Sequence, residues 1–272
     1  MTRLKPADIV HIPRTLRLYD KELRSKTGCN LLELAEDAAH ANTTVRRILK
    51  ETEASVVPIT SGGGVIHGFS EAVAAILNHI GVKTMITRTG DIVGIAETYE
   101  QGCDLLFVAD DKRFVAINTH TRRVVDNAAS TGKAYVAALN RMANGLTGKP
   151  VLVIGVGKVG SAAISDLVLR RAKPLAVDVD RPKLKDLKAR FGREVSVFSR
   201  STDALRKTSL IINTAPGRRI IKADMVKENT LISAPAIPLG LTQAALRKVG
   251  QNLVHDSLQL GVATMAVQAC AN

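Results

Sequence analysis

The chain has 272 residues, 46% of them hydrophobic, which is typical of a globular protein with a sizeable core and excludes a disordered chain. No apolar run reaches the ~20 residues that a membrane helix needs, and the N-terminal segment lacks the apolar stretch of a secretory signal, so we expect a cytoplasmic protein with no membrane partner. The formal net charge is +13, but aromatic residues make up only 3% and no nucleic-acid-binding motif is present, so the charge favours an anionic cofactor over nucleic acid.

Residues 1 to about 50 are predicted to form helices. Apolar side chains recur at seven-residue spacing over residues 9–23, as on one face of a helix, and Gly28 is expected to end that helix. Asn30 and Glu33 stand three residues apart, which is the spacing of a capping box, so a second helix is expected to begin there.

Strands and helices alternate from Ser55 onward, which predicts a small parallel α/β layer. Ser70 is expected to be the N-cap of the first of these helices. Residues 112–128 show no periodicity and are expected to be irregular. The expected elements are strands over residues 55–60, 83–87 and 104–109, and helices over residues 70–79, 91–101 and 131–144.

The predicted domain boundary lies in residues 145–150, which hold two glycines and a proline. The fold class is therefore α/β with two domains. Residues 1–147 are expected to form a helical N-terminal region with a small α/β layer on the substrate side, and residues 148–272 a Rossmann-type parallel-sheet dinucleotide-binding domain.

The stretch over residues 151–180 has the pattern of a dinucleotide-binding βαβ unit. An uncharged β-branched run is followed by Gly155, Gly157 and Gly160 in the order G-x-G-x-x-G, then by a helical pattern and a second strand that ends at Asp178. Gly155 suits the tight turn out of the strand, Gly157 leaves the backbone open to a pyrophosphate, and Gly160 permits close helix packing. The spacing of all these parts predicts a bound dinucleotide.

Asp178 is expected to accept hydrogen bonds from the adenosine ribose hydroxyls, which predicts NAD as the cofactor. Later strands complete the site, because ligands of open α/β sheets bind at the carboxyl ends of the strands. Expected strands end near residues 198, 212, 233 and 254, and the last helix is expected to begin at Val262. The expected cofactor-binding residues are Gly155, Val156, Gly157, Lys158, Val159, Gly160, Asp178, Thr214, Ala215, Pro216, Ala234 and Pro235.

Four stretches together resemble the pyrrolysine-biosynthesis dehydrogenase family, also called the pyrrolysine synthases. They are VPITSGGGVIHGFSEAV, ADDKRFVAIN, VLVIGVGKVG and SAPAIP, and the similarity runs from about Lys5 to the last helix. The first two stretches are much more specific than the glycine turn, which many dehydrogenases share.

The resemblance implies a definite reaction. Enzymes of this family take lysine that is acylated on its side-chain amine by 3-methyl-D-ornithine. They use NAD to oxidise the carbon that carries the terminal amine of the ornithine. Ammonia is then lost and the ornithine α-amine closes the pyrroline ring, so the implied partner is a small dipeptide-like substrate.

The resemblance also suggests Ser61, Asp110 and Asn127 as substrate-side groups. A cationic amine calls for carboxylates, and Asp110 is expected to hold or deprotonate it, the alternative being a turn acid after a strand. Asp256, where the family has glutamate, is a second acid for an amine, or else a solvated turn residue. Asp111 is expected to be structural, as an N-cap.

Two further departures from the family pattern stand at Gly63, in place of asparagine, and at Ala236, in place of glycine. Cys29, Cys103 and Cys270 have no metal-ligand spacing, and no metal is expected. The sequence leaves the oligomeric state open, with a homodimer as one form.

Two alternative functions remain open. The first is a shikimate-type or other amino-acid NAD(P) dehydrogenase, although no lysine–aspartate pair of the shikimate type is present in the first domain. The second is a nucleotide-sensing or nucleic-acid-binding Rossmann protein, suggested by the net charge.

Overall fold

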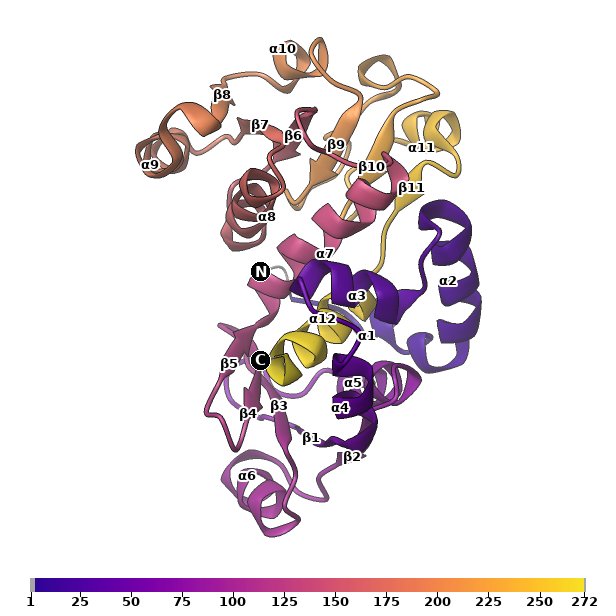
Figure 1. Ribbon diagram of the computed structural model, residues 1–272, viewed down its shortest axis with the longest axis vertical. Coiled ribbons are helices and arrows are strands. Elements are labelled where there is room, and N and C mark those ends of the chain that lie inside the picture. The colour runs from indigo at the N-terminus through magenta and orange to yellow at the C-terminus, as the bar shows by residue number, and fades with distance from the viewer. Residues whose placement is uncertain (1–2, 272) are drawn as a thin grey trace. The chain divides into compact units, whose positions relative to one another are not determined.

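Figure 1 shows the computed structural model, which describes residues 3–271. The chain folds into two compact units. The first comprises residues 3–22, 30–130 and 257–271, and the second comprises residues 23–29 and 131–256. The sequence placed the domain boundary after residue 147 and the last helix in the second domain, so the compact units differ from that prediction in both places.

The sheet of the first unit has five strands in the order β2-β1-β3-β4-β5. The first three are parallel, whereas β4 is antiparallel to β3 and β5 is antiparallel to β4, so β5 again runs in the direction of β3. The strands are β1 (Glu53–Val57), β2 (Lys83–Ile86), β3 (Leu105–Ala109), β4 (Phe114–Asn118) and β5 (Val124–Asp126).

The expectation that residues 112–128 are irregular is wrong. The turn after β3 returns the chain antiparallel, and the apolar run from Phe114 to Ile117 pairs residue by residue with β3. The predicted parallel layer is therefore correct for β1 to β3 and becomes antiparallel at one edge.

Helices of the first unit follow the predicted order. The capping box is confirmed, because the Glu33 amide donates to Asn30 Oδ1 at 2.9 Å and the Asn30 amide donates to Glu33 Oε2 at 2.8 Å. The Ser70 cap is wrong, since Gly68 is the N-cap of α5 and Ser70 is buried in its first turn. The helices are α1 (Pro6–Ile9), α2 (Ile12–Thr27), α3 (Leu31–Ala39), α4 (Val45–Glu51), α5 (Phe69–His79) and α6 (Asp91–Glu100).

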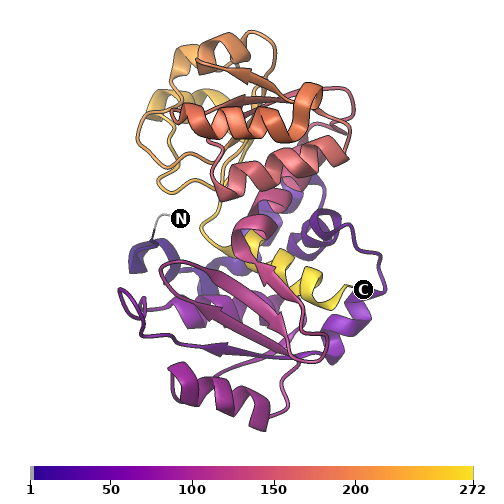
Figure 2. The ribbon, with the colours of Figure 1, turned by 90° about the vertical axis from the view of Figure 1, so that its left-hand side faces the viewer.

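The last helix, α12 (Gln259–Cys270), lies at the centre of the first unit. Every residue from Gln259 to Cys270 is buried, and the helix packs against α3, α5 and β4 (Figure 2). It has no charged residue and its apolar side chains are distributed around the whole helix, as expected for a helix that is surrounded by other elements.

The sheet of the second unit is parallel throughout, in the order β11-β10-β9-β6-β7-β8. Read from β8, this is the doubly wound order 3-2-1-4-5-6, with the switch point between β6 and β9. The strands are β6 (Pro150–Ile154), β7 (Lys173–Val177), β8 (Ser196–Phe198), β9 (Leu210–Asn213), β10 (Leu231–Ser233) and β11 (Leu253–Val254). The Rossmann-type prediction is confirmed.

Both faces of this sheet are buried, as the uncharged run of β6 predicts. Val151 and Val153 face one apolar core together with α7 and α8, while Leu152 and Ile154 face a second core with α10 and α11. The helices of the second part of the chain are α7 (Asn127–Met142), α8 (Lys158–Leu169), α9 (Arg181–Phe191), α10 (Ser201–Leu205) and α11 (Gln243–Val249), with 3₁₀ turns at Gly192–Glu194 and Ala223–Met225. Along residues 3–271, no helix combines the length and apolarity needed to cross a bilayer.

Candidate functional site

The glycine turn lies between β6 and α8, at the switch point of the second sheet. Gly155 has φ +90°, and a Cβ there would lie 2.9 Å from the Ala215 amide nitrogen. A Cβ on Gly160 would overlap the Gly155 carbonyl oxygen and come within 2.8 Å of Thr214 Oγ1. Both glycines are therefore required by the packing of the turn itself.

Gly157 has a different role. It is the N-cap of α8, with φ −66°, and no atom lies within 4 Å of the position that its Cβ would take. The protein's own packing does not require a glycine here, whereas a ligand that approaches the backbone does. The free N–H groups of the first turn of α8 offer such a ligand hydrogen bonds, which suits a pyrophosphate.

Asp178 follows β7 and is tied to the same turn. Its Oδ2 accepts the Val156 amide at 2.6 Å, and its Oδ1 accepts the Asp180 amide at 2.8 Å. Each carboxylate oxygen can accept a second hydrogen bond, so ribose hydroxyls can still be bound. The half-buried carboxylate thus both positions the glycine turn and presents acceptors at its edge.

Residues after β9 complete this edge. Thr214 donates from its amide to the Ile154 carbonyl at 2.9 Å and from Oγ1 to the Gly155 carbonyl at 2.8 Å, which fixes the first glycine. Asn213 was not predicted. It is fully buried, its Nδ2 donates to the Leu239 carbonyl at 2.9 Å, and its Oδ1 accepts no hydrogen bond within the described residues.

The expected cofactor-binding residues thus lie together at the carboxyl ends of the parallel strands β6, β7, β9 and β10. Ala215 packs against Gly155, and the Ala234 carbonyl oxygen lies 2.6 Å from His255 Nδ1, from which it accepts a hydrogen bond. The geometry fits a dinucleotide: an open glycine, a helix N-terminus and an acid are presented together. Binding itself stays a prediction.

Asp110 is the first residue of the hairpin turn between β3 and β4. Its Oδ1 accepts the Lys112 amide at 2.8 Å and the Arg113 amide at 2.7 Å. The backbone N–H groups of Arg113 and Lys112 hold the pKa of Asp110 below its ordinary value. The carboxylate is therefore exposed, ionised and engaged as a turn acid on one oxygen, which suits holding an ammonium better than removing a proton.

Asp111 binds the glycine-rich loop over residues 61–64. Its carboxylate accepts the Gly63 amide at 2.7 Å and pairs with the Arg3 guanidinium. Arg3 also donates to the Gly63 and Gly64 carbonyls, at 2.8 Å and 2.7 Å. Asp111 is structural as expected, but as a loop acceptor and not as a helix N-cap.

The Arg3 guanidinium lies beside Gly63, one of the departures from the family pattern. A Cβ at residue 63 would overlap it, but the end of the Arg3 side chain is flexible and can shift, so the contact alone does not require a glycine there. No sequence pattern pointed to Arg3, which reaches the loop from 60 residues away.

Three of the four expected substrate-side residues lie at the carboxyl ends of parallel strands in the first sheet. The loop that holds Ser61 follows β1, Asp110 follows β3, and Asn127 follows β5, which runs parallel to β3. Ser61 is exposed, whereas Asn127 is buried as the first residue of α7. The carboxyl ends of the strands thus bring these residues to the same side of the sheet.

Asp256 belongs to the second unit and is buried, not a solvated turn residue. The Tyr135 hydroxyl accepts the Asp256 amide at 2.9 Å and donates to the Asp256 carbonyl at 3.0 Å. Burial, and next the Asp256 charge, raise the pKa of Tyr135 well above its ordinary value. Tyr135 thus holds the backbone of Asp256 in place, and it was not among the residues predicted for the site.

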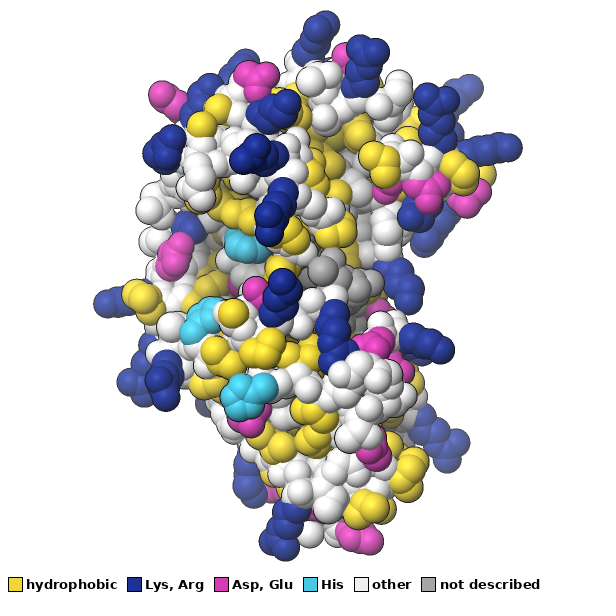
Figure 3. Space-filling model, turned by 180° about the vertical axis from the view of Figure 1, so that it is seen from behind, with side chains coloured by type: hydrophobic (Ala, Val, Ile, Leu, Met, Phe, Trp, Pro, Cys, Tyr) yellow, Lys and Arg dark blue, Asp and Glu magenta, His cyan; other side chains and the backbone are white. Residues whose placement is uncertain are grey.

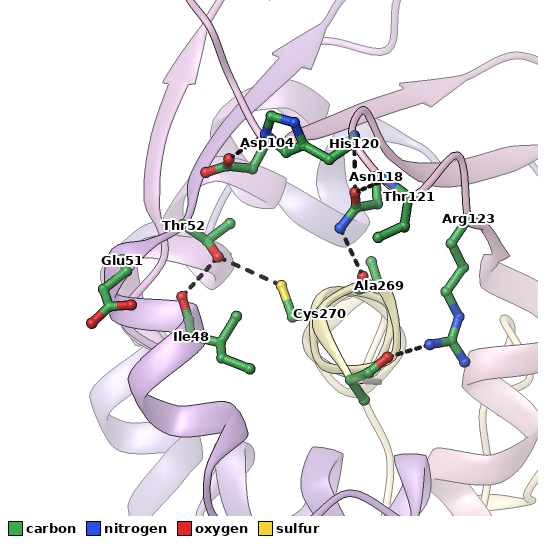
Figure 4. Close-up of a pocket in the computed structure, with 11 residues that line it drawn as sticks. Ile48, Glu51, Thr52, Asp104, Asn118, His120, Thr121, Arg123, Ala269 and Cys270 are labelled. Atoms are coloured by element: carbon green, nitrogen blue, oxygen red, sulfur yellow. Dashed lines mark hydrogen bonds and ion pairs between the residues drawn. The ribbon is translucent and has the colours of Figure 1, made fainter.

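A cavity of about 600 Å³ lies in the first unit, at the opposite end of the strands (Figure 4). Thr52 and Asp104 come before β1 and β3, and Asp104 Oδ1 lies 2.8 Å from His120 Nε2. None of the expected site residues lines it. Within residues 3–271 no group of three His, Cys, Asp or Glu side chains is arranged to hold a metal ion.

Comparisons with known proteins cover nearly the whole chain. The family model of the pyrrolysine biosynthesis protein PylD, N-terminal domain, matches residues 8–125. The pyrrolysine synthase of Methanosarcina acetivorans is 28% identical over 265 residues, which is 97% of this chain and 98% of that protein. The pyrrolysine synthase of Methanosarcina barkeri is 26% identical, again over 97% of both chains.

Solved structures show a similar fold. Shikimate dehydrogenase from Aquifex aeolicus has a TM-score of 0.54 at 17% identity, covering 77% of this chain and 88% of that chain. Quinate dehydrogenase from Corynebacterium glutamicum, in complex with NAD, has a TM-score of 0.53 at 14% identity, covering 80% and 92%. These likenesses support the Rossmann-type architecture. The chain is thus similar to the pyrrolysine synthases over nearly its whole length, and residues 8–125 match the family model of the pyrrolysine biosynthesis protein PylD, N-terminal domain.

Proposed function

We propose that this protein is an NAD-dependent dehydrogenase that forms pyrrolysine from 3-methyl-D-ornithyl-N6-L-lysine. The similarity to pyrrolysine synthases over 97% of the chain carries the proposal. The glycine turn supports it, because Gly157 is open where a dinucleotide would approach and Asp178 stands beside it.

The proposed reaction removes hydride from the carbon that carries the terminal amine of the ornithine. Bound NAD would supply the hydride acceptor. The amine must be neutral before its carbon can give hydride, so one proton leaves the ammonium first. The α-amine then adds to the resulting imine carbon, ammonia leaves, and the pyrroline ring closes.

The chain's own residues have separate roles in this proposal. The N–H groups at the start of α8 bind the pyrophosphate, and Asp178 accepts from the ribose. Asp110 offers its second carboxylate oxygen to a substrate ammonium, since only Oδ1 is engaged by the turn amides. Ser61 and Asn127 provide neutral hydrogen bonds for the amide or carboxylate of the substrate, and Asp256 is the second acid.

The experiment is a direct turnover assay. The protein is incubated with NAD and the methylornithyl-lysine dipeptide, and NADH absorbance is followed together with the mass of the product. We expect NADH, and a product that lacks two hydrogens and one ammonia relative to the dipeptide. NADH formation with shikimate or quinate, and none with the dipeptide, would replace the proposal with the shikimate-type alternative.

A further inference from the structure

The net positive charge of the chain is confined to one of its two units. Residues 23–29 and 131–256 carry 24 Lys and Arg against 9 Asp and Glu, a formal charge of +15. The remaining residues carry 14 Lys and Arg against 16 Asp and Glu, a formal charge of −2. Lys and Arg side chains are spread over the whole of the face drawn in Figure 3, so the two units differ in the balance of charges and not in the presence of cations.

Neither ligand of the proposed reaction accounts for a unit with this charge. A dinucleotide has two phosphates, and the glycine turn binds them with backbone N–H groups. The dipeptide substrate carries cationic amines, which a basic unit repels. A partner with many negative charges matches the unit better.

The densest part of this charge surrounds β8, the strand at one edge of the second sheet. Residues 181–207 hold nine exposed Lys and Arg against three acids. They come from α9, α10 and the segments beside β8, and these elements pack on one another. We call this the α9–α10 basic surface. Its members are Arg181, Lys183, Lys185, Lys188, Arg190, Arg193, Arg200, Arg206 and Lys207.

Most of these cations are not neutralised within the protein. Lys183 pairs with Asp180 at 3.0 Å, and Lys188 donates to the Val195 carbonyl at 2.8 Å. Five others have no ion pair or hydrogen bond from their side chains to any residue of the described chain: Arg181, Lys185, Arg193, Arg200 and Arg206.

Aromatic rings are interleaved with the charge. The Arg190 guanidinium lies 4.8 Å from the centre of the Phe191 ring, and the Lys207 ammonium lies 5.1 Å from that of Phe198. These are two of the five phenylalanines in the chain, and both rings are half-buried. Cations beside aromatic faces suit a phosphate backbone with stacked bases.

A lipid surface is a poorer match to the same residues. Membrane-surface helices insert large apolar side chains between the lipids. Over residues 181–207, all of which the structure describes, Val197 is the one large hydrophobic side chain that is exposed, at 38%. The surface therefore has the charge for anionic lipids but little to insert.

We propose that the α9–α10 basic surface binds nucleic acid through its phosphate backbone, with little dependence on base sequence. This role is separate from the dehydrogenase reaction. Phosphate contacts by Lys and Arg release counterions, so the affinity should fall steeply with salt. A Kd of roughly 10⁻⁴ to 10⁻⁶ M at physiological salt is the ordinary range for such binding.

The test uses the full chain and a fluorescent single-stranded RNA of mixed sequence, with anisotropy read at several salt concentrations. One variant carries Lys185→Gln, Arg193→Gln, Arg200→Gln and Arg206→Gln. A matched variant removes the same charge near the opposite, β10–β11 edge of the sheet, through Lys222→Gln, Lys227→Gln, Arg247→Gln and Lys248→Gln.

We expect the α9–α10 variant to bind RNA at least about tenfold more weakly near physiological salt, with the slope of log Kd against log salt reduced by about three. The matched variant should keep most of the affinity. Near physiological salt, where most of the charge repulsion is screened, both variants should unfold close to the temperature of the unaltered protein and bind NADH equally well, which separates this proposal from the proposed dehydrogenase activity.

Four results would overturn the proposal. The first is RNA binding by the unaltered protein that is weaker than about 10⁻⁴ M at physiological salt. The second is an equal loss in the two variants, which would make the effect one of total charge. The third is complete displacement of RNA by NADH, and the fourth is binding to vesicles of anionic lipid without binding to RNA.

Discussion

Gly157 and Gly160 stand three residues apart, but the structure predicts opposite consequences for their substitution. Gly157→Ala places a methyl group in open space at an ordinary φ, so the protein should fold with unchanged stability and lose affinity for the dinucleotide. Gly160→Ala drives a methyl group into the Gly155 carbonyl. It should therefore lower the free energy of unfolding by about 1–3 kcal/mol or more, which is the usual cost of overpacking.

Urea unfolding and NADH fluorescence titration check both variants. NADH affinity that is unchanged in Gly157→Ala would show that no ligand approaches the backbone there. A Gly160→Ala variant with the same free energy of unfolding as the unaltered protein would mean that the turn can widen without loss of stability.

Asp110 can be tested with little disturbance of its turn. Asp110→Asn keeps an oxygen that can accept the Lys112 and Arg113 amides, but it removes the negative charge. We expect a folded protein that binds NAD normally and turns over roughly 10- to 10²-fold more slowly, because a hydrogen bond from the substrate ammonium to a charged acceptor is worth about 1.5–3 kcal/mol. Near-normal turnover would make Asp110 a turn acid only, with Asp256 the next residue to test.

The pH dependence follows from the lowered pKa of Asp110. A depressed pKa keeps the carboxylate charged at neutral pH, and the charge is lost only as the pH falls below the ordinary Asp value of about 3.9. A loss of rate between pH 8 and 5 should therefore not come from Asp110, and it should persist in Asp110→Asn.

Asp178 should make the protein prefer NAD over NADP, because its carboxylate repels a 2′-phosphate. Asp178→Ala should weaken NAD binding and narrow the preference for NAD over NADP. The substitution also leaves the Val156 amide without its acceptor. Asp180→Ala is the comparison: it removes the N-cap of α9 and the ion pair with Lys183 but keeps the Asp178 carboxylate, so it should narrow the preference for NAD less than Asp178→Ala does. Equal use of both cofactors by the unaltered protein contradicts the assignment.

At the scale of elements, the capping box of α3 gives a clean stability prediction. Asn30→Ala removes the acceptor of the Glu33 amide and should lower the free energy of unfolding by about 1 kcal/mol. Asn42→Ala changes an asparagine on the exposed loop before α4, and its free energy of unfolding is compared with that of Asn30→Ala. Equal denaturation midpoints for Asn30→Ala and the unaltered protein would mean that the cap does not stabilise the folded state.

Elements with local signals were predictable. The run over residues 151–154, its glycines and Asp178 lie within one βαβ unit, and each signal depends on neighbours along the chain. The N-cap of α9 is local in the same way, since Asp180 Oδ1 accepts the Lys183 amide at 3.3 Å.

Elements whose signal is not local were missed. The turn from Asp110 to Arg113 lacks the Asn-Gly or Asp-Gly pair that marks a hairpin, so β4 was not recognised. The ion pair between Arg3 and Asp111 joins residues 108 positions apart, and no pattern near either residue indicates it. The place of α12 in the first unit likewise depends on packing against α3 and α5.

At the scale of the whole molecule, the uneven charge predicts an uneven response to salt. Like charges repel within the +15 unit, and this repulsion opposes its folding. Raising the salt shortens the Debye length from about 30 Å at 0.01 M to about 8 Å at 0.15 M, which screens most of the repulsion. The unit with a charge of −2 has little repulsion to lose, and its ion pairs, such as Arg46 with Glu36 at 2.6 Å, are weakened by the same screening.

Hydrogen exchange resolves the two units in one experiment. Amides of β6 and β9 should become better protected as NaCl is raised over this range, while those of β1 and β3 should change little or lose protection. The variant with four glutamines in the α9–α10 basic surface should show a smaller gain in β6 and β9, because less repulsion remains to be screened. A uniform gain in both units would point to a general salt effect on burial, and no gain in β6 and β9 would mean that counter-charges already balance the second unit.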